Sequence, residues 1–261
     1  MNTLKTRGGW ARRLSLAALV LSLGGIAAAL VAAVGTGTGL WAYGAGLGML
    51  RFVLPAVAVG GLLAIVAWIV ARRTGTRVGW PNALALVTAL LFLAYLGNMI
   101  FTARSLPMIH DATTDLADVP QFTVLKVRAD NLDKVPDLGR ADLKALSPEE
   151  RWKALHREAY GDLRPLILDL PPEQALARAE QLVRQRGWNI ARVDPAAGTV
   201  EATATTLFFR FKDDIVIRVR PQPLGGGSIV DMRSISRVGL SDIGVNAKRV
   251  RNFMRDLEAG K

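Results

Sequence analysis

Residues 214–238, "DIVIRVRPQPLGGGSIVDMRSISRV", hold two segments of alternating apolar and polar side chains, separated by a glycine-rich turn. This alternation is typical of β-strands with one buried face, because successive side chains in a strand point to opposite faces. We therefore expect an antiparallel hairpin. Its apolar face is formed by Ile215, Ile217, Val219, Val230 and Met232.

The flanking sequence extends this hairpin into an α+β domain. The segments "WNIARV" (188–193) and "GTVEATATT" (198–206) predict two more strands, and "RPLIL" (164–168) predicts a strand before a helix that opens at Pro172. Residues 242–257 have apolar residues at helical spacing and predict a terminal helix. Strands joined by short turns and flanked by helices indicate an antiparallel sheet with helices packed on one face.

The opposite face of the predicted sheet carries charged and hydroxyl side chains. Its acidic and hydroxyl members are Asp214, Asp231, Glu201, Thr203 and Thr205, and its basic members are Arg218, Arg220, Arg233 and Arg237. One interpretation is a solvated face crossed by ion pairs between strands. The other is a surface that recognises an anionic headgroup or an acidic partner, since the arginine fork pairs bidentately with carboxylate or phosphate. We expect the four arginines to leave a local excess of positive charge.

The N-terminal part of the chain contains three uncharged apolar segments, at about 14–34, 52–70 and 83–101. Each is long enough to cross a bilayer as a helix. A cleavable signal peptide is the alternative for the first segment. The segment is longer than the usual signal core, however, and no clear cleavage site follows it. The spans have no buried ionisable residue of the kind that transporters use, so we interpret residues 1–104 as an anchor and 105–261 as a separate domain.

The distribution of charge predicts the orientation in the membrane. The net charge is +11, yet residues 1–104 contain nine basic and no acidic residues, while the rest contains 24 basic and 22 acidic residues. A nearly neutral domain argues against nucleic-acid binding. By the positive-inside rule, the N-terminus is cytoplasmic and the domain lies outside the cytoplasm. We expect the membrane to be a bacterial inner membrane and the domain to lie in the periplasm. The absence of cysteine fits that compartment without proving it.

His110, one of two histidines, lies in "PMIHDATTDLADVP" (107–120) just after the last span. We interpret this stretch as a turn-rich exit from the membrane, in which Asp111 and Asp115 accept backbone hydrogen bonds. The alternative joins His110 and Asp111 to Asp213 and Asp214 as an acid–base cluster or a carboxylate metal site. With two histidines and no cysteine, the chain lacks the usual zinc ligands, and we expect neither a metal nor another cofactor.

Four further local predictions complete the domain. "QFTVLKV" (121–127) alternates weakly and predicts a strand, and residues 131–148 predict a polar surface excursion. Ser147, Pro148 and Glu150 form a capping signal for a short helix. His156 on that helix is interpreted as a surface or boundary residue.

Several stretches of the domain resemble a known bacterial family. They are "IHDATTD", "EAYGDLRPL", "RGWNI", "DPAAGTVEATATT", "FKDDIVIRV" and "VDMRSISRVGLSDIGVNAKRV". They are similar to the family catalogued as domain of unknown function 1499, whose members also carry an apolar N-terminal region. The resemblance supports the architecture, and it implies no activity, cofactor or catalytic residue.

These observations favour a three-span inner-membrane protein that displays a periplasmic binding or interaction domain. The expected partners are the lipid bilayer and an anionic lipid or an acidic protein, bound through the arginine face. The alternative is a membrane-anchored hydrolase or metal-dependent enzyme that uses the His110, Asp111, Asp213 and Asp214 cluster. That enzyme would need the four side chains to converge in one pocket.

Overall fold

The computed structural model describes residues 2–223 and 225–260, and these divide into two compact units. The helical unit holds the residues up to Thr102 together with Leu207–Arg210. The sheet unit holds Ala103–Thr206 and the residues from Phe211 onward.

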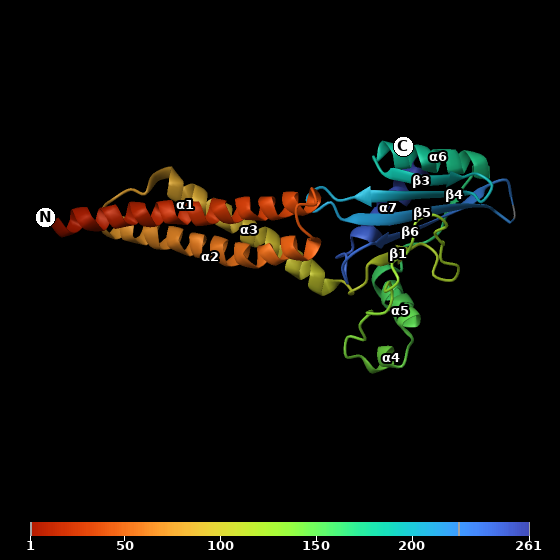
Figure 1. Cartoon of the computed structure of the whole chain (residues 1–261), viewed down its shortest axis with the longest axis horizontal. Helices are drawn as coiled ribbons and strands as arrows, with labels where there is room; N and C mark the ends of the chain where they lie inside the picture. The colour runs from red at the N-terminus through yellow and green to blue at the C-terminus, as the bar shows by residue number, and fades with distance from the viewer. Residues whose placement is uncertain (1, 224, 261) are drawn as a thin grey trace. The chain divides into compact units, whose positions relative to one another are not determined.

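Three long helices make up the N-terminal region (Figure 1). They are α1 (Asn2–Gly37), α2 (Tyr43–Arg73) and α3 (Gly79–Ser105). Each contains one of the predicted apolar segments, and each is long and apolar enough to cross a membrane. The three predicted spans are therefore present as helices.

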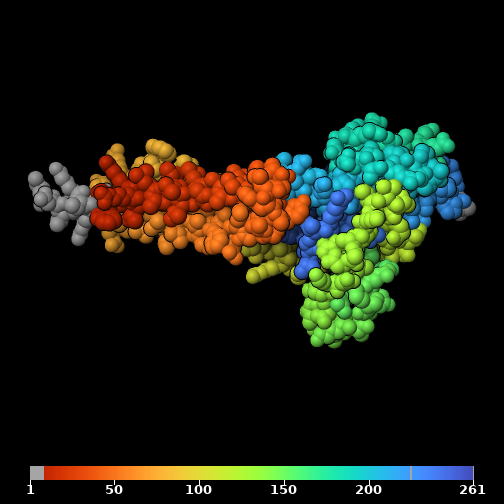
Figure 2. Space-filling model, viewed as in Figure 1, coloured from red at the N-terminus to blue at the C-terminus, as the bar shows by residue number. Residues whose placement is uncertain are grey.

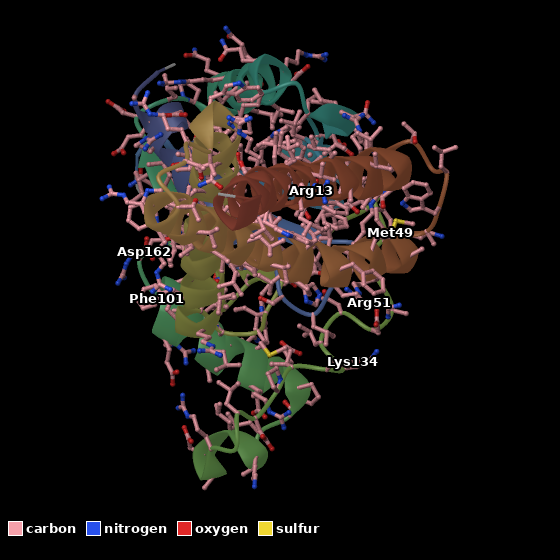
Figure 3. The ribbon with its side chains drawn as sticks, turned by 90° about the vertical axis from the view of Figure 1, so that its left-hand side faces the viewer. Arg13, Met49, Arg51, Phe101, Lys134 and Asp162 are labelled. Atoms are coloured by element: carbon pink, nitrogen blue, oxygen red, sulfur yellow. The ribbon has the colours of Figure 1, made fainter. Side chains whose placement is uncertain are left out.

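Basic side chains near the predicted span ends lie against aromatic rings. The guanidinium of Arg72 is 4.7 Å from the centre of the Trp68 ring, and that of Arg51 is 4.6 Å from the Phe52 ring. The guanidinium of Arg13 is 5.7 Å from the centre of the Trp10 ring; Figure 3 labels both Arg13 and Arg51. Such contacts let a long basic side chain cover apolar surface while its charged end reaches towards water.

Small residues bring α1 and α2 into close contact. Ala18 and Ala64 are fully buried, and a Cβ atom at Gly60 would collide with Ser22 on α1. Close backbone approach through small residues is the usual basis of helix association in lipid, where burial of apolar surface provides little driving force.

Gly60→Val should loosen the α1–α2 pair, because its side chain has no space beside Ser22. We expect a loss of about 1–3 kcal/mol in the free energy of unfolding, the usual range for overpacking. Thermal unfolding of the full-length protein in detergent measures the effect. Gly48→Val on the same helix is the matched control, since nothing lies within 4 Å of a Cβ there. Equal destabilisation by both variants would contradict this packing.

An antiparallel sheet of six strands forms the second unit, in the order β1-β6-β5-β4-β3, with β2 paired to β6 beside β1. The predicted α+β class is confirmed. The strands are β1 (Asp111–Thr113), β2 (Leu166–Leu168), β3 (Asn189–Asp194), β4 (Thr199–Thr205), β5 (Lys212–Pro221) and β6 (Ser228–Ser236).

Two helices, α6 (Pro172–Gln185) and α7 (Val245–Glu258), pack on the apolar face of this sheet (Figure 1). The register pairs Ile217 with Met232 and Val219 with Val230, so both strands of the predicted hairpin present the expected residues to the core. The core also contains Phe253 of α7.

The remaining helices are α4 (Ala141–Lys144) and α5 (Pro148–Tyr160), in the segment drawn green in Figure 2. The predicted capping box at Ser147 is present, with Glu150 as its partner. The predicted surface excursion is only partly superficial, because Asn131, Val135 and Leu143 within it are buried.

The exit segment differs from its prediction. Asp115 does accept hydrogen bonds from the backbone of Ala117 and Asp118, as expected of a turn. Asp111, however, begins strand β1, which pairs with β6. Three residues are too few to show an alternating pattern, so no strand is predicted there from the sequence.

Candidate functional site

The polar face of the sheet is covered by the chain's own segment after β1. Asp231 on β6 is fully buried and accepts hydrogen bonds from Arg218 (3.0 Å) and Arg220 (2.7 Å). A carboxylate oxygen of Asp118 lies 2.9 Å from a guanidinium nitrogen of Arg218 and 3.2 Å from one of Arg220. A carboxylate oxygen of Asp115 lies 3.4 Å from a guanidinium nitrogen of Arg220. Two arginines therefore share three aspartates.

A second cluster surrounds Arg233, which forms a bidentate pair with Asp111 at 2.7 and 3.0 Å. Both side chains are buried. Asn131 donates to Asp111 (2.8 Å), and Nε2 of His110 donates to the amide oxygen of Asn131 (3.0 Å). His110 therefore belongs to a hydrogen-bonded chain that ends on a buried ion pair.

Asp213 and Asp214 are held separately. As neighbours in β5 they point to opposite faces of the sheet. Asp214 pairs with Arg237 at 2.7 Å, and Asp213 pairs with Arg249 of α7 at 2.6 Å. The four residues of the candidate acid–base cluster thus do not converge: each of the three aspartates is engaged by a different arginine.

The predicted excess of positive charge on the arginine face is absent. Arg218, Arg220, Arg233 and Arg237 contact five aspartates, namely Asp111, Asp115, Asp118, Asp214 and Asp231. The sequence pattern placed Asp214 and Asp231 on the face. The covering segment brings Asp115 and Asp118, and strand β1 brings Asp111. That these four arginines bind a ligand stays a prediction.

Glu201 holds the covering segment against the sheet. Its side chain is buried and accepts hydrogen bonds from the backbone N–H groups of Thr123, Val124 and Leu125, and from the Thr123 hydroxyl at 2.5 Å. These N–H groups point at a carboxylate instead of a neighbouring strand, so the strand predicted at 121–127 does not form. Burial alone would raise the pKa of Glu201, but the hydrogen bonds outweigh it and lower the pKa below its usual value.

Glu201→Gln should release the covering segment, because an amide NH₂ would face backbone donors. Hydrogen bonds to a charged group contribute about 1.5–3 kcal/mol each, so we expect the free energy of unfolding to fall by about 2–4 kcal/mol. Because the pKa of Glu201 is lower in the folded state, its carboxylate stabilises the fold at pH values above the unfolded glutamate pKa of about 4.3. This stabilisation is lost as the pH falls below that value. Hydrogen exchange at residues 121–127 in the full-length protein measures the release. Glu180→Gln on α6, in an exposed pair with Arg184, is the control. Unchanged protection in Glu201→Gln would contradict the role of this carboxylate.

Two side chains of α5 complete the outer edge of β1. Trp152 donates to the carbonyl oxygen of Asp111 (2.9 Å), and Nε2 of His156 accepts from the N–H of Thr113 (3.0 Å). They satisfy backbone groups that an edge strand would otherwise leave unpaired. His156 is 1% exposed, so its interpretation as a surface or boundary residue is wrong. Its partner is a backbone group 43 residues away, which sequence spacing does not indicate.

Burial lowers the pKa of His156 to about 4, against attraction from Asp111 and Asp162. The ring is therefore neutral near pH 7, and because Nε2 accepts from Thr113, the proton is on Nδ1. Nδ1 has no hydrogen-bond partner among the described residues, and neither has the buried Tyr160 hydroxyl. Burial also raises the pKa of Tyr160.

The pH dependence of stability should reveal this histidine. Because its pKa is lowered on folding, its contribution is fully present above about 6.5, the unfolded value, and is lost as pH falls towards 4. At about 1.4 kcal/mol per pH unit, the loss is roughly 3 kcal/mol. Chemical unfolding of the full-length protein in detergent, compared with His156→Gln, measures it. Glutamine keeps an acceptor for Thr113 but does not titrate, so its stability curve should be flatter. Parallel curves would contradict the assignment.

A pocket of about 340 Å³ lies beside the C-terminal end of α5. His156, Tyr160 and Thr114 contribute polar groups to its lining. Leu116, Leu163 and Pro165 contribute apolar surface, and Arg157 and Arg164 are also part of the lining. The lining thus includes the two residues that have an unpartnered buried polar atom and two basic side chains.

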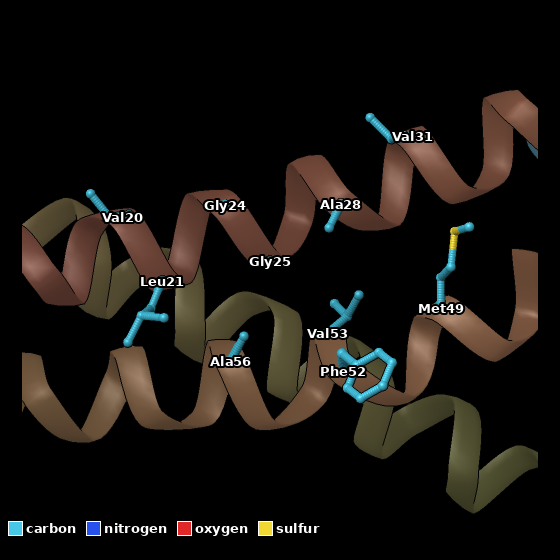
Figure 4. Close-up of a pocket in the computed structure, with 10 residues that line it drawn as sticks. All are labelled: Val20, Leu21, Gly24, Gly25, Ala28, Val31, Met49, Phe52, Val53 and Ala56. Atoms are coloured by element: carbon cyan, nitrogen blue, oxygen red, sulfur yellow. The ribbon is translucent and has the colours of Figure 1, made fainter.

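A second pocket, of about 400 Å³, lies in the helical unit between α1 and α2 (Figure 4). Its lining includes Gly24, Gly25 and Ala28 of α1, and Phe52 and Val53 of α2. The small residues on α1 leave room opposite larger side chains on α2, and the lining has no charged side chain.

A family model described as a protein of unknown function, DUF1499, matches residues 111–257. The match covers more than half of the chain. The chain belongs to the DUF1499 family. No curated protein matches the sequence. The DUF1499 match begins at Asp111, the first residue of β1, and ends at Leu257, within α7. It therefore spans the whole sheet, α6, all of α7 except its last residue, and the residues that line the pocket beside α5.

Proposed function

We propose that this chain is an inner-membrane protein whose three spans anchor a periplasmic binding domain that recognises an anionic ligand. This proposal rests mainly on how the candidate catalytic acids are paired. Asp111, Asp213 and Asp214 each form an ion pair with a different arginine. A general acid or base needs access to a substrate proton, and a paired carboxylate held by an arginine has little freedom to supply it. Binding is better supported than catalysis.

The alternative, a metal-dependent enzyme, has less support from the same geometry. Among the described residues, no group of three or more His, Asp or Glu side chains is placed to hold a metal ion. The pocket beside α5 contains hydrogen-bonding groups and basic side chains but no carboxylate in its lining. Such a lining suits recognition of an anion.

The proposed orientation rests on arginine asymmetry. Arg72, Arg73 and Arg77 lie at or after the end of α2, before α3, whereas the connection between α1 and α2, residues 38–42, has no charge. The positive-inside rule then places the N-terminus in the cytoplasm and the sheet unit outside.

A reporter that is active only outside the cytoplasm tests this orientation. Fused after Lys261 it should be active, and fused within residues 74–78 it should be inactive. Matched fusions to a reporter that is active only in the cytoplasm are the control and should give the reverse pattern. Activity of the outside-only reporter at residues 74–78, with none after Lys261, would place the domain in the cytoplasm and overturn the proposed location.

A further inference from the structure

Two arginines beside the pocket at α5 differ from most others in the family domain. In its described part, three arginine side chains form no hydrogen bond or ion pair: Arg157, Arg164 and Arg210. Arg210 lies in the turn between β4 and β5. Arg157 and Arg164 are exposed and line the same pocket, so two of these three unpaired guanidinium groups belong to one site.

The acids nearest in sequence are engaged elsewhere. Glu158 accepts hydrogen bonds from Arg140 at 2.7 and 2.8 Å. Asp162, labelled in Figure 3, accepts two hydrogen bonds from Arg251 of α7. Neighbouring carboxylates are thus not available to neutralise the pocket arginines. The C-terminal end of α5 contributes only partial negative charge, which Arg157 in its last turn offsets.

The rest of the lining suits a ligand with one charged and one apolar part. Leu116 and Leu163 provide apolar contact beside the arginines. Tyr160 and His156 line the pocket and each has a buried polar atom without a partner among the described residues. A volume of about 340 Å³ is at the lower end of the usual range for small-molecule sites, and is large enough for a headgroup-sized molecule.

From this combination we infer that the pocket beside α5 binds a phosphate group carried on an apolar or short organic body. Two arginine forks match the charge and the bidentate geometry of phosphate. The inference rests on the proposed function, because it takes the sheet unit to be a binding domain. The anion-binding residues in this proposal are Arg157 and Arg164, in place of the sheet arginines that the sequence analysis predicted.

Calorimetry on the full-length protein in phosphatidylcholine nanodiscs tests this site. The probes are inorganic phosphate, dihexanoyl phosphatidic acid and, as the matched zwitterionic lipid, dihexanoyl phosphatidylcholine. The native protein should bind phosphatidic acid in preference to phosphatidylcholine, with an affinity that falls as salt rises. Inorganic phosphate binding comparably would identify small phosphate compounds as the source, and binding of phosphatidic acid alone would identify a lipid headgroup.

The decisive variant is Arg157→Gln with Arg164→Gln, which should weaken phosphatidic acid or phosphate binding by at least about tenfold. Arg178→Gln with Arg184→Gln on α6 removes the same net charge outside the pocket lining, and should change affinity by less than about twofold. Absence of binding by the native protein, or equal loss in both double variants, overturns the assignment. A cytoplasmic location found with the reporter fusions would instead overturn the proposed location and leave this result intact.

Discussion

The sheet unit depends on one buried ion pair, between Asp111 at the start of β1 and Arg233 on β6. Burying both charges is costly unless each is paired and its remaining hydrogen-bonding groups are satisfied. Asn131 and the carbonyl oxygen of Pro120 supply those partners, so the covering segment must fold back over the sheet. The same pairing of β1 with β6 fixes where the chain enters the domain after α3.

The covering segment pairs with charged side chains on the polar face of the sheet and buries some of them, among them Asp231 and Glu201. Its aspartates neutralise Arg218 and Arg220, and its backbone N–H groups bind Glu201. Several charges that look available in the sequence are therefore structural. Arg157 and Arg164, whose side chains form no hydrogen bond or ion pair with the described residues, border a pocket beside α5.

Helix α5 connects these two features. Trp152 and His156, one turn apart, hydrogen-bond the outer edge of β1, which protects the short strand from further pairing. The next turn carries Tyr160, whose ring lies 5.5 Å from that of His156. His156 therefore both stabilises β1 and lines the pocket beside α5.

The sequence by itself determined the elements that follow from hydrophobic period and length: three apolar helices, the hairpin of β5 and β6, and the helices on its apolar face. Residues 214–238 already showed which side chains share a face, because strand periodicity is local. The partners of those side chains were decided only by tertiary structure. Asp111 meets Arg233 across 122 positions and Thr113 meets His156 across 43. Such contacts depend on how the covering segment and α5 return to the sheet, and residue spacing along the chain has no information about that return.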